Sequence, residues 1–94
     1  MFVLQIEHAV PSFEGWKQAF DSDPVGRRAS AVRRHQVFRP VDDANYAIIE
    51  LDFDTFEEAE AMVVKLKKLW SSVEGTVMMN PQVRIVERID TFDY

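Results

Sequence analysis

The sequence predicts an α+β domain whose elements follow the order strand, helix, strand, strand, helix, strand. Period-two alternation of apolar residues predicts the strands, helical spacing of apolar residues predicts the helices, and both kinds of segment recur in the same order in each half. The length of 94 residues, with 47% hydrophobic and 29% charged residues, is typical of a globular chain with one core. We therefore expect residues 1–94 to form a single domain, with a short C-terminal tail at residues 90–94.

The first half begins with an expected strand from Phe2 to Val10, in which every second residue is suited to a buried face. Ser12 follows and is a good N-cap, because its hydroxyl can accept a hydrogen bond from the first turn of a helix. The apolar residues Phe13, Trp16 and Phe20 then recur at helical spacing. A helix is therefore predicted directly after Ser12.

The middle of the chain is expected to hold a short helical piece and two strands. Residues 23–31 are expected to be helical, because Asp23 can cap a helix and Pro24 is tolerated at its first position. Residues 32–39 resemble an edge strand, since several polar residues occur in succession. A turn at residues 40–45 leads to an apolar strand from Tyr46 to Phe53, which is expected to be central.

The second half continues with the most clearly marked helix. Thr55 and Glu58 have the spacing of a capping box, and helical spacing is kept by Phe56, Ala59, Val63, Leu66 and Trp70. Gly75 is expected to end the loop that follows. The last strand is predicted at residues 82–89.

An internal repeat supports this topology. A shift of 43 positions places Ile6 on Ile49 and Ser12 on Thr55, which implies two copies of strand, helix, strand. Split units of this kind form the ferredoxin-like fold, a four-stranded antiparallel sheet with two helices on one face. The other face is left uncovered, and we expect a homodimer to form through it. Its expected residues are Val3, Gln5, Glu7, Tyr46, Ile48, Glu50, Arg84, Val86 and Arg88.

Composition excludes several classes of function. A net charge of −5 disfavours a broad nucleic-acid surface, and no apolar run approaches the roughly 18 to 20 residues that a membrane helix needs. The chain has no cysteine and no leader-like N-terminus, so we expect a cytoplasmic protein. A local basic cluster is either a solvated surface or a site for an anionic ligand or acidic partner; it consists of Arg27, Arg28, Arg33, Arg34 and Arg39.

Three stretches resemble a known group of proteins. They are residues 13–21 (FEGWKQAFD), 37–45 (VFRPVDDAN) and 50–59 (ELDFDTFEEA). They look like the corresponding stretches of an uncharacterised branch of the dimeric α/β-barrel superfamily, which includes antibiotic-biosynthesis-monooxygenase-like proteins. The resemblance implies a dimer with facing sheets and a cavity between sheet and helices in each subunit. The superfamily includes oxygenases without cofactors, haem degraders, isomerases, decarboxylases and binding proteins.

His8 is the first candidate for a catalytic residue. The repeat places it at the position of Leu51, on the helix-facing side of a strand, where a polar ring needs a partner. It is either a core histidine satisfied by one hydrogen bond or a general acid or base that contacts a ligand. Trp16 and Phe20 are either core residues or the walls of a pocket for a flat ligand.

His35 and Arg39 are further candidates, since their spacing in a strand makes them project from one face. They form either an anion-binding pair or a solvated edge. We expect no metal ion, because two histidines without metal-ligand spacing are a weak signal, and no cofactor. Two functions stay open: a cofactor-independent monooxygenase or isomerase of a small aromatic or conjugated molecule, and a non-catalytic small-molecule-binding or stress-related dimeric module.

Overall fold

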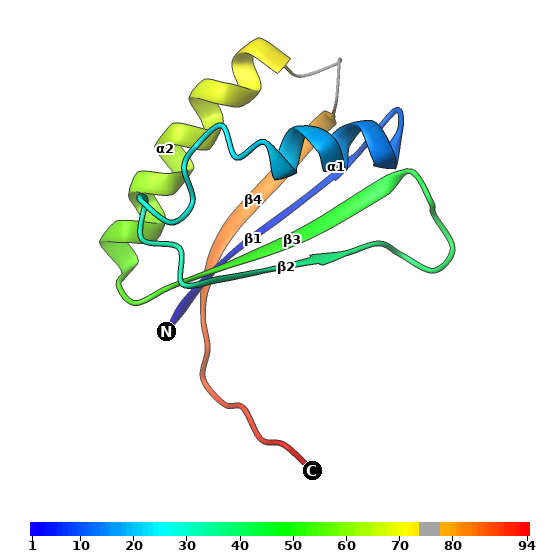
Figure 1. The fold of residues 1–94 in the computed structure, drawn as a ribbon. Helices are drawn as coiled ribbons and strands as arrows, with labels where there is room; N and C mark the ends of the chain where they lie inside the picture. Colours follow the sequence, from blue (N-terminus) through cyan, green and yellow to red (C-terminus); the bar gives the residue numbers. More distant parts are fainter. Residues whose placement is uncertain (74–77) are drawn as a thin grey trace.

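The structure, a computed structural model, describes residues 1–73 and 78–94 of the chain. Its elements are β1 (Phe2–Ala9), α1 (Phe13–Asp21), β2 (Arg34–Phe38), β3 (Tyr46–Phe53), α2 (Phe56–Val73) and β4 (Met79–Glu87). The four strands form one antiparallel sheet in the order β2-β3-β1-β4. Figure 1 shows α1 and α2 on one face of this sheet and the opposite face bare. The predicted ferredoxin-like α+β fold is confirmed.

The sheet also confirms the predicted roles of its strands. β1 and β3 lie in the middle and pair along their full length, with Ile6 opposite Ile49, the two residues that the repeat equates. β2 is an edge strand, as its polar sequence predicts, and pairs only with β3. The repeat therefore corresponds to two strands that lie side by side at the centre of the sheet.

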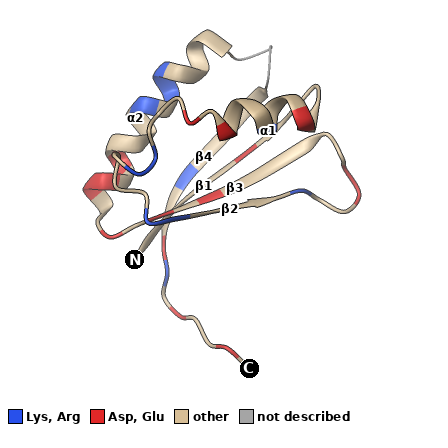
Figure 2. Cartoon of the chain, in the orientation of Figure 1, with Lys and Arg blue, Asp and Glu red and all other residues tan. Residues whose placement is uncertain are grey.

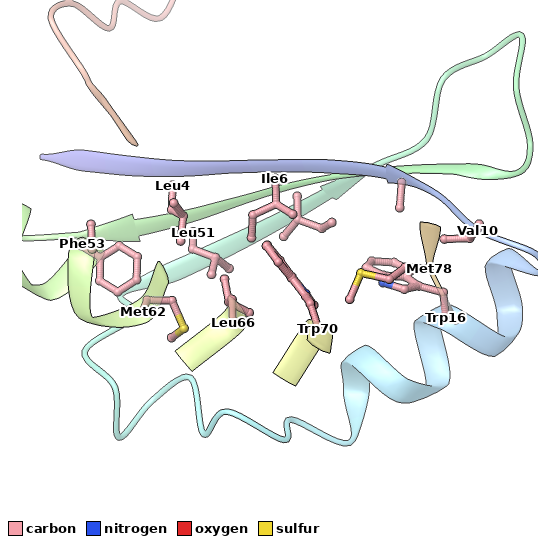
Figure 3. Packing of buried hydrophobic residues seen from close by; sticks show 13 residues of the cluster. Leu4, Ile6, Val10, Trp16, Leu51, Phe53, Met62, Leu66, Trp70 and Met78 are labelled. Carbon is pink, nitrogen blue, oxygen red and sulfur yellow. The ribbon is translucent and has the colours of Figure 1, made fainter. Parts of the chain in front are cut away.

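The core fills the layer between the sheet and the helices (Figure 3). Leu4 and Phe53 are fully buried in it, and α2 contributes Ala59, Met62, Leu66 and Trp70. Met62 takes the buried position that the sequence pattern suggested for Val63, because successive buried residues of α2 follow three or four positions apart. Among the described residues, neither helix has the length and apolar character needed to cross a membrane.

Both helices begin as the sequence predicts. The backbone N–H of Gly15 donates to Oγ of Ser12 (3.2 Å) at the start of α1. At the start of α2, the N–H of Glu58 donates to Oγ1 of Thr55, and the N–H of Thr55 donates to the Glu58 carboxylate, both at 3.2 Å. The capping box is therefore complete, and it satisfies donors that the first turn of a helix leaves free.

Residues 23–31 are not helical, and the prediction of a second helical piece there is wrong. Asp23 (φ 57°), Gly26 (φ 62°) and Ala31 (φ 73°) have left-handed backbone conformations, which cannot continue a right-handed helix. The Asp23 carboxylate does cap local backbone, since it accepts from the N–H of Arg27 at 2.9 Å, but it closes a turn. The segment is a series of turns that crosses from α1 to β2.

The last strand also differs from its prediction. β4 begins at Met79, three residues before the predicted start, and ends at Glu87 rather than at residue 89. It contains Pro81, which lacks a backbone donor, but β4 is an edge strand and can accommodate a proline. The expectation that Gly75 ends the preceding loop lies outside the described residues. The tail that follows β4 extends away from the sheet (Figure 1).

Candidate functional site

A pocket of about 280 Å³ lies between the helix-covered face of the sheet and the two helices. β1, β3, α1, α2 and the turn segment all contribute to its lining, which is mostly apolar. The polar exceptions are His8, Ser22 and Arg27. We call it the aromatic pocket, because Trp16, Phe20 and Trp70 are among its walls. Its volume is close to the lower limit of about 300 Å³ that is usual for small-molecule sites.

His8 projects from β1 into the aromatic pocket and is only 2% exposed. Its Nδ1 lies 3.2 Å from the carbonyl oxygen of Ala9. A carbonyl can only accept, so Nδ1 must carry the proton and Nε2 of the neutral ring keeps its lone pair. Nε2 has no recorded hydrogen-bond partner among residues 1–73 and 78–94, and His8 lines the aromatic pocket.

Burial sets the protonation state of His8. Desolvation lowers its pKa below the ordinary value of 6.5, and the hydrogen bond to the Ala9 carbonyl offsets part of that effect. A lowered pKa keeps the ring neutral at pH 7. His8 therefore presents an unprotonated nitrogen, which is a base, to an apolar cavity.

Aromatic rings form a continuous row from His8 on β1 to Phe20 near the end of α1. The His8 ring meets Trp16 edge-on at 5.6 Å between centroids, and Trp16 stacks on Phe20 at 5.2 Å with 29° between the planes. Figure 3 shows Trp16 and Trp70 pointing into the layer between helices and sheet. Trp16 and Phe20 therefore lie together with His8 around one cavity.

Arg27 completes the polar lining, and the sequence did not single it out from the basic cluster. Its guanidinium carbon lies 3.9 Å from the centre of the Phe20 ring, and its Nη1 donates to the Phe20 carbonyl at 2.8 Å. A cation over an aromatic face is held by the ring quadrupole. This placement does not follow from the expected helix at residues 23–31, because a helix would not turn Arg27 back onto α1.

His35 and Arg39 both contact α1, on the helix side of the sheet, but neither lines the aromatic pocket. The His35 ring meets Phe20 edge-on at 5.1 Å, while the Arg39 guanidinium lies 4.8 Å from the Phe13 ring. They contact different residues of α1 and do not form a pair around one ligand. The structure thus gathers His8, Trp16 and Phe20 and leaves these two residues outside the cavity.

The fold and the pocket define a small ferredoxin-like protein with a cavity between sheet and helices. No family model and no curated protein matches the sequence. Solved structures do match in shape. A candidate antibiotic-biosynthesis monooxygenase from Deinococcus radiodurans has a TM-score of 0.70 at 8% identity, over 100% of this chain and 98% of that one.

Two further structures are similar over nearly the whole chain. A monooxygenase from the gene ActVA-Orf6 of Streptomyces coelicolor, in complex with nanaomycin D, has a TM-score of 0.65 at 10% identity, over 99% of this chain and 91% of that one. A dimeric ferredoxin-like protein from an uncultured marine organism has a TM-score of 0.66 at 10% identity, over 99% and 98%. The chain therefore has the fold of these monooxygenase-like proteins, as the resemblance of its sequence predicts.

Proposed function

We propose that the chain is a cofactor-independent monooxygenase of a small aromatic or conjugated molecule, with His8 as the general base. The observation that carries the proposal is the lining of a cavity walled by aromatic rings by His8, whose Nδ1 is bonded to the Ala9 carbonyl and whose Nε2 has no recorded partner. A base of lowered pKa in an apolar site is suited to proton abstraction near neutral pH. The monooxygenase-like proteins of the same fold are consistent with this chemistry.

The reaction needs no group beyond the substrate, oxygen and the base. His8 removes the proton of a phenol, and the resulting anion is electron-rich enough to reduce O₂. One oxygen atom bonds to the ring carbon, the other leaves as water, and the phenol becomes a quinone. The substrate supplies all four electrons that O₂ accepts. Trp16 and Phe20 hold the ring, and the positive charge of Arg27 stabilises the phenolate.

Oxygen uptake tests the proposal. With polyphenols as substrates, we expect stoichiometric consumption of O₂ and a kcat/KM that falls as the pH drops through the pKa of His8, because protonation removes the base. That limb should lie below pH 6.5, since burial lowers the pKa. Nanaomycin D, which the Streptomyces protein binds, is a suitable inhibitor to try. Turnover of the substrate in the absence of oxygen would indicate an isomerase, in which His8 returns the proton to a different carbon of the substrate.

A binding module is the second candidate, and one observation favours it. No carboxylate is found among the described residues that line the aromatic pocket, so His8 has no acidic partner to orient it or to share its proton. Such a pocket could hold a ligand without turning it over. Tight binding of a polyphenol, with no oxygen uptake and no product between pH 5 and pH 9, would favour the module.

We also propose that two copies pair through the bare face of the sheet. Several of its charged groups already have a partner within one chain: buried Asp52 lies 3.2 Å from Arg34 and 3.5 Å from Arg88, and the Tyr46 hydroxyl donates to Glu7 at 2.9 Å. That hydrogen bond raises the pKa of Tyr46, so the hydroxyl stays protonated.

Apolar side chains between these charged groups give the face its affinity for a second copy. Ile48 and Val86 project from it and are only half-buried, while Phe38 is 44% exposed. Burying them against a twofold-related sheet would remove apolar area from water. The dimeric marine protein of the same fold supports this arrangement.

Replacing Ile48 with aspartate should convert the dimer into monomer. The carboxylate would have to be buried without a partner on the twofold-related sheet, which costs several kcal/mol. Sedimentation at micromolar concentration measures the result. Val64→Asp, the same change at a 66% exposed position of α2, is the matched control and should leave the mass unchanged. A monomeric parent protein would contradict the pairing.

A further inference from the structure

A second pocket lies on the outer side of the turn segment, beside the start of β2. It has a volume of about 460 Å³, and its polar lining consists of Arg27, Arg28, Arg33, Arg34, His35 and Asp23. We call it the basic pocket. Figure 2 shows the basic segments of the turn region and of the first residues of β2 on the same side of the molecule. Four arginines thus line one hollow in a chain whose net charge is −5.

The turn segment brings these residues together. The N–H of Val32 donates to the carbonyl of Arg27 at 3.0 Å, which folds the chain back on itself, and Ala31 adopts a left-handed conformation (φ 73°) at the bend. The N–H of Arg33 then donates to the carbonyl of Asp52 at 2.8 Å and anchors the segment to β3. Two arginine pairs, separated by four residues in the sequence, therefore line the same hollow.

Most of the arginines already have a carboxylate. Arg33 lies 2.9 Å from Asp54, Arg34 lies 3.2 Å from Asp52, and the Nε of Arg27 lies 3.5 Å from Asp23. Each of these pairs fixes a guanidinium while leaving some of its five donors free.

Arg28 is the exception. Its guanidinium has no ion pair with any carboxylate of residues 1–73 and 78–94. On α2, Lys65 donates from Nζ to Oγ of Ser30 and adds a further cation next to the segment. The pocket therefore keeps an excess positive charge and free, preorganised donors, which is the arrangement that binds oxyanions.

We propose that the basic pocket binds an oxyanion, such as a phosphate, sulfate or carboxylate group, at the charged end of the ligand whose ring occupies the aromatic pocket. Arg27 lines both pockets, so the two cavities adjoin at this side chain. Phe20 lies near the same junction, since it lines the aromatic pocket and meets the ring of His35, a residue of the basic pocket, at 5.1 Å. This inference rests on the proposed function and specifies its substrate class: flat aromatic molecules that carry an anionic group.

Calorimetric titration with three probes tests the inference: 1-naphthol, 1-naphthyl phosphate and inorganic phosphate. We expect naphthyl phosphate to bind about ten-fold more tightly than naphthol, because an ionised group adds charge-assisted hydrogen bonds. Added salt should reduce this advantage, since exposed charges are screened. Inorganic phosphate should compete with naphthyl phosphate and leave naphthol binding unchanged.

A pair of matched variants assigns the effect to the basic pocket. Arg28→Gln should weaken naphthyl phosphate binding about five-fold, the upper range for an exposed charge pair, and leave naphthol binding as it was. Lys67→Gln removes the same charge from an exposed position of α2 that lines neither pocket, and should change neither affinity.

The outcomes separate this inference from the proposed function. Equal affinities for naphthol and naphthyl phosphate, or an Arg28→Gln variant that behaves like Lys67→Gln, would overturn the basic pocket as an anion site and leave the aromatic pocket standing. Binding of inorganic phosphate that depends on Arg28, without any binding of naphthol, would support a site for free anions and contradict the proposed function.

Discussion

Replacing His8 with leucine is expected to lower turnover by about 10²- to 10⁴-fold, the usual contribution of a general base. The fold should persist, because the side chain is 2% exposed among apolar neighbours and leucine removes a group that is costly to desolvate. Leucine also occupies the equivalent position, residue 51, in the second half of the repeat. Oxygen uptake measures the rate, and thermal unfolding measures the stability.

A second variant at the same position distinguishes chemistry from packing. His8→Ala leaves a space next to Trp16 that free imidazole can enter, so added imidazole should restore part of the rate in this variant and none in His8→Leu. Such a rescue would show that turnover depends on the imidazole nitrogen and not only on the shape of the side chain. Full activity in His8→Leu would show that His8 is a satisfied core histidine and would remove the base from the proposed mechanism.

Replacing Phe53 with alanine is expected to lower the free energy of unfolding by about 3 to 5 kcal/mol. The ring is fully buried at the end of β3, beneath α2, so its loss leaves a cavity in the core (Figure 3). That loss is a large part of the roughly 5 to 15 kcal/mol that stabilises a domain of this size. Urea unfolding at a fixed protein concentration is the appropriate measurement, because pairing would make stability depend on concentration.

Phe56→Ala is the matched control for this change. Phe56 lies three residues further along, at the start of α2, and is 42% exposed with an edge contact to Phe2 at 6.0 Å. Its removal opens no enclosed cavity, so we expect a loss of about 1 kcal/mol or less. Equal losses in the two variants would contradict the placement of Phe53 in the core and of Phe56 at its rim.

Most of the fold could be predicted because its signals are local. β3 was expected from Tyr46 to Phe53 and has those bounds, since strict alternation marks both its faces. The two helix starts follow from Ser12 and Thr55, whose caps involve residues three positions away. The prediction for residues 23–31 was wrong because the local signal there is ambiguous. An aspartate followed by a proline suits either a helix or a turn, and nothing nearby in the sequence distinguishes the two.

The candidate site was predicted only in part. The repeat placed His8 on the helix-facing side, where it lies, and the helical spacing of Trp16 and Phe20 placed both rings on one side of α1. Arg27 was missed, and His35 and Arg39 lie outside the aromatic pocket. These three positions depend on how the turn segment crosses from α1 to β2, which the backbone bond from Arg33 to Asp52 anchors across the sheet.

The bare face of the sheet was likewise predicted only in part. Alternation identified which residues it carries, but not their partners within the chain, where Glu7 accepts from Tyr46 and Glu50 accepts from Gln5. Those partners are neighbours only after β1 pairs with β3. Side-chain pairing therefore had to be read from the register and not from residue types.

Local residue patterns were sufficient for the helices, the strands and the helix caps, because each depends on residues a few positions apart. The 43-residue repeat added the topology, the covered face of the sheet and the orientation of His8. The tertiary structure alone decided the aromatic and basic pockets and their junction at Arg27, which lies over the Phe20 ring. Both pockets are bounded by elements distant in sequence, and their shape depends on contacts that form only when those elements pack together.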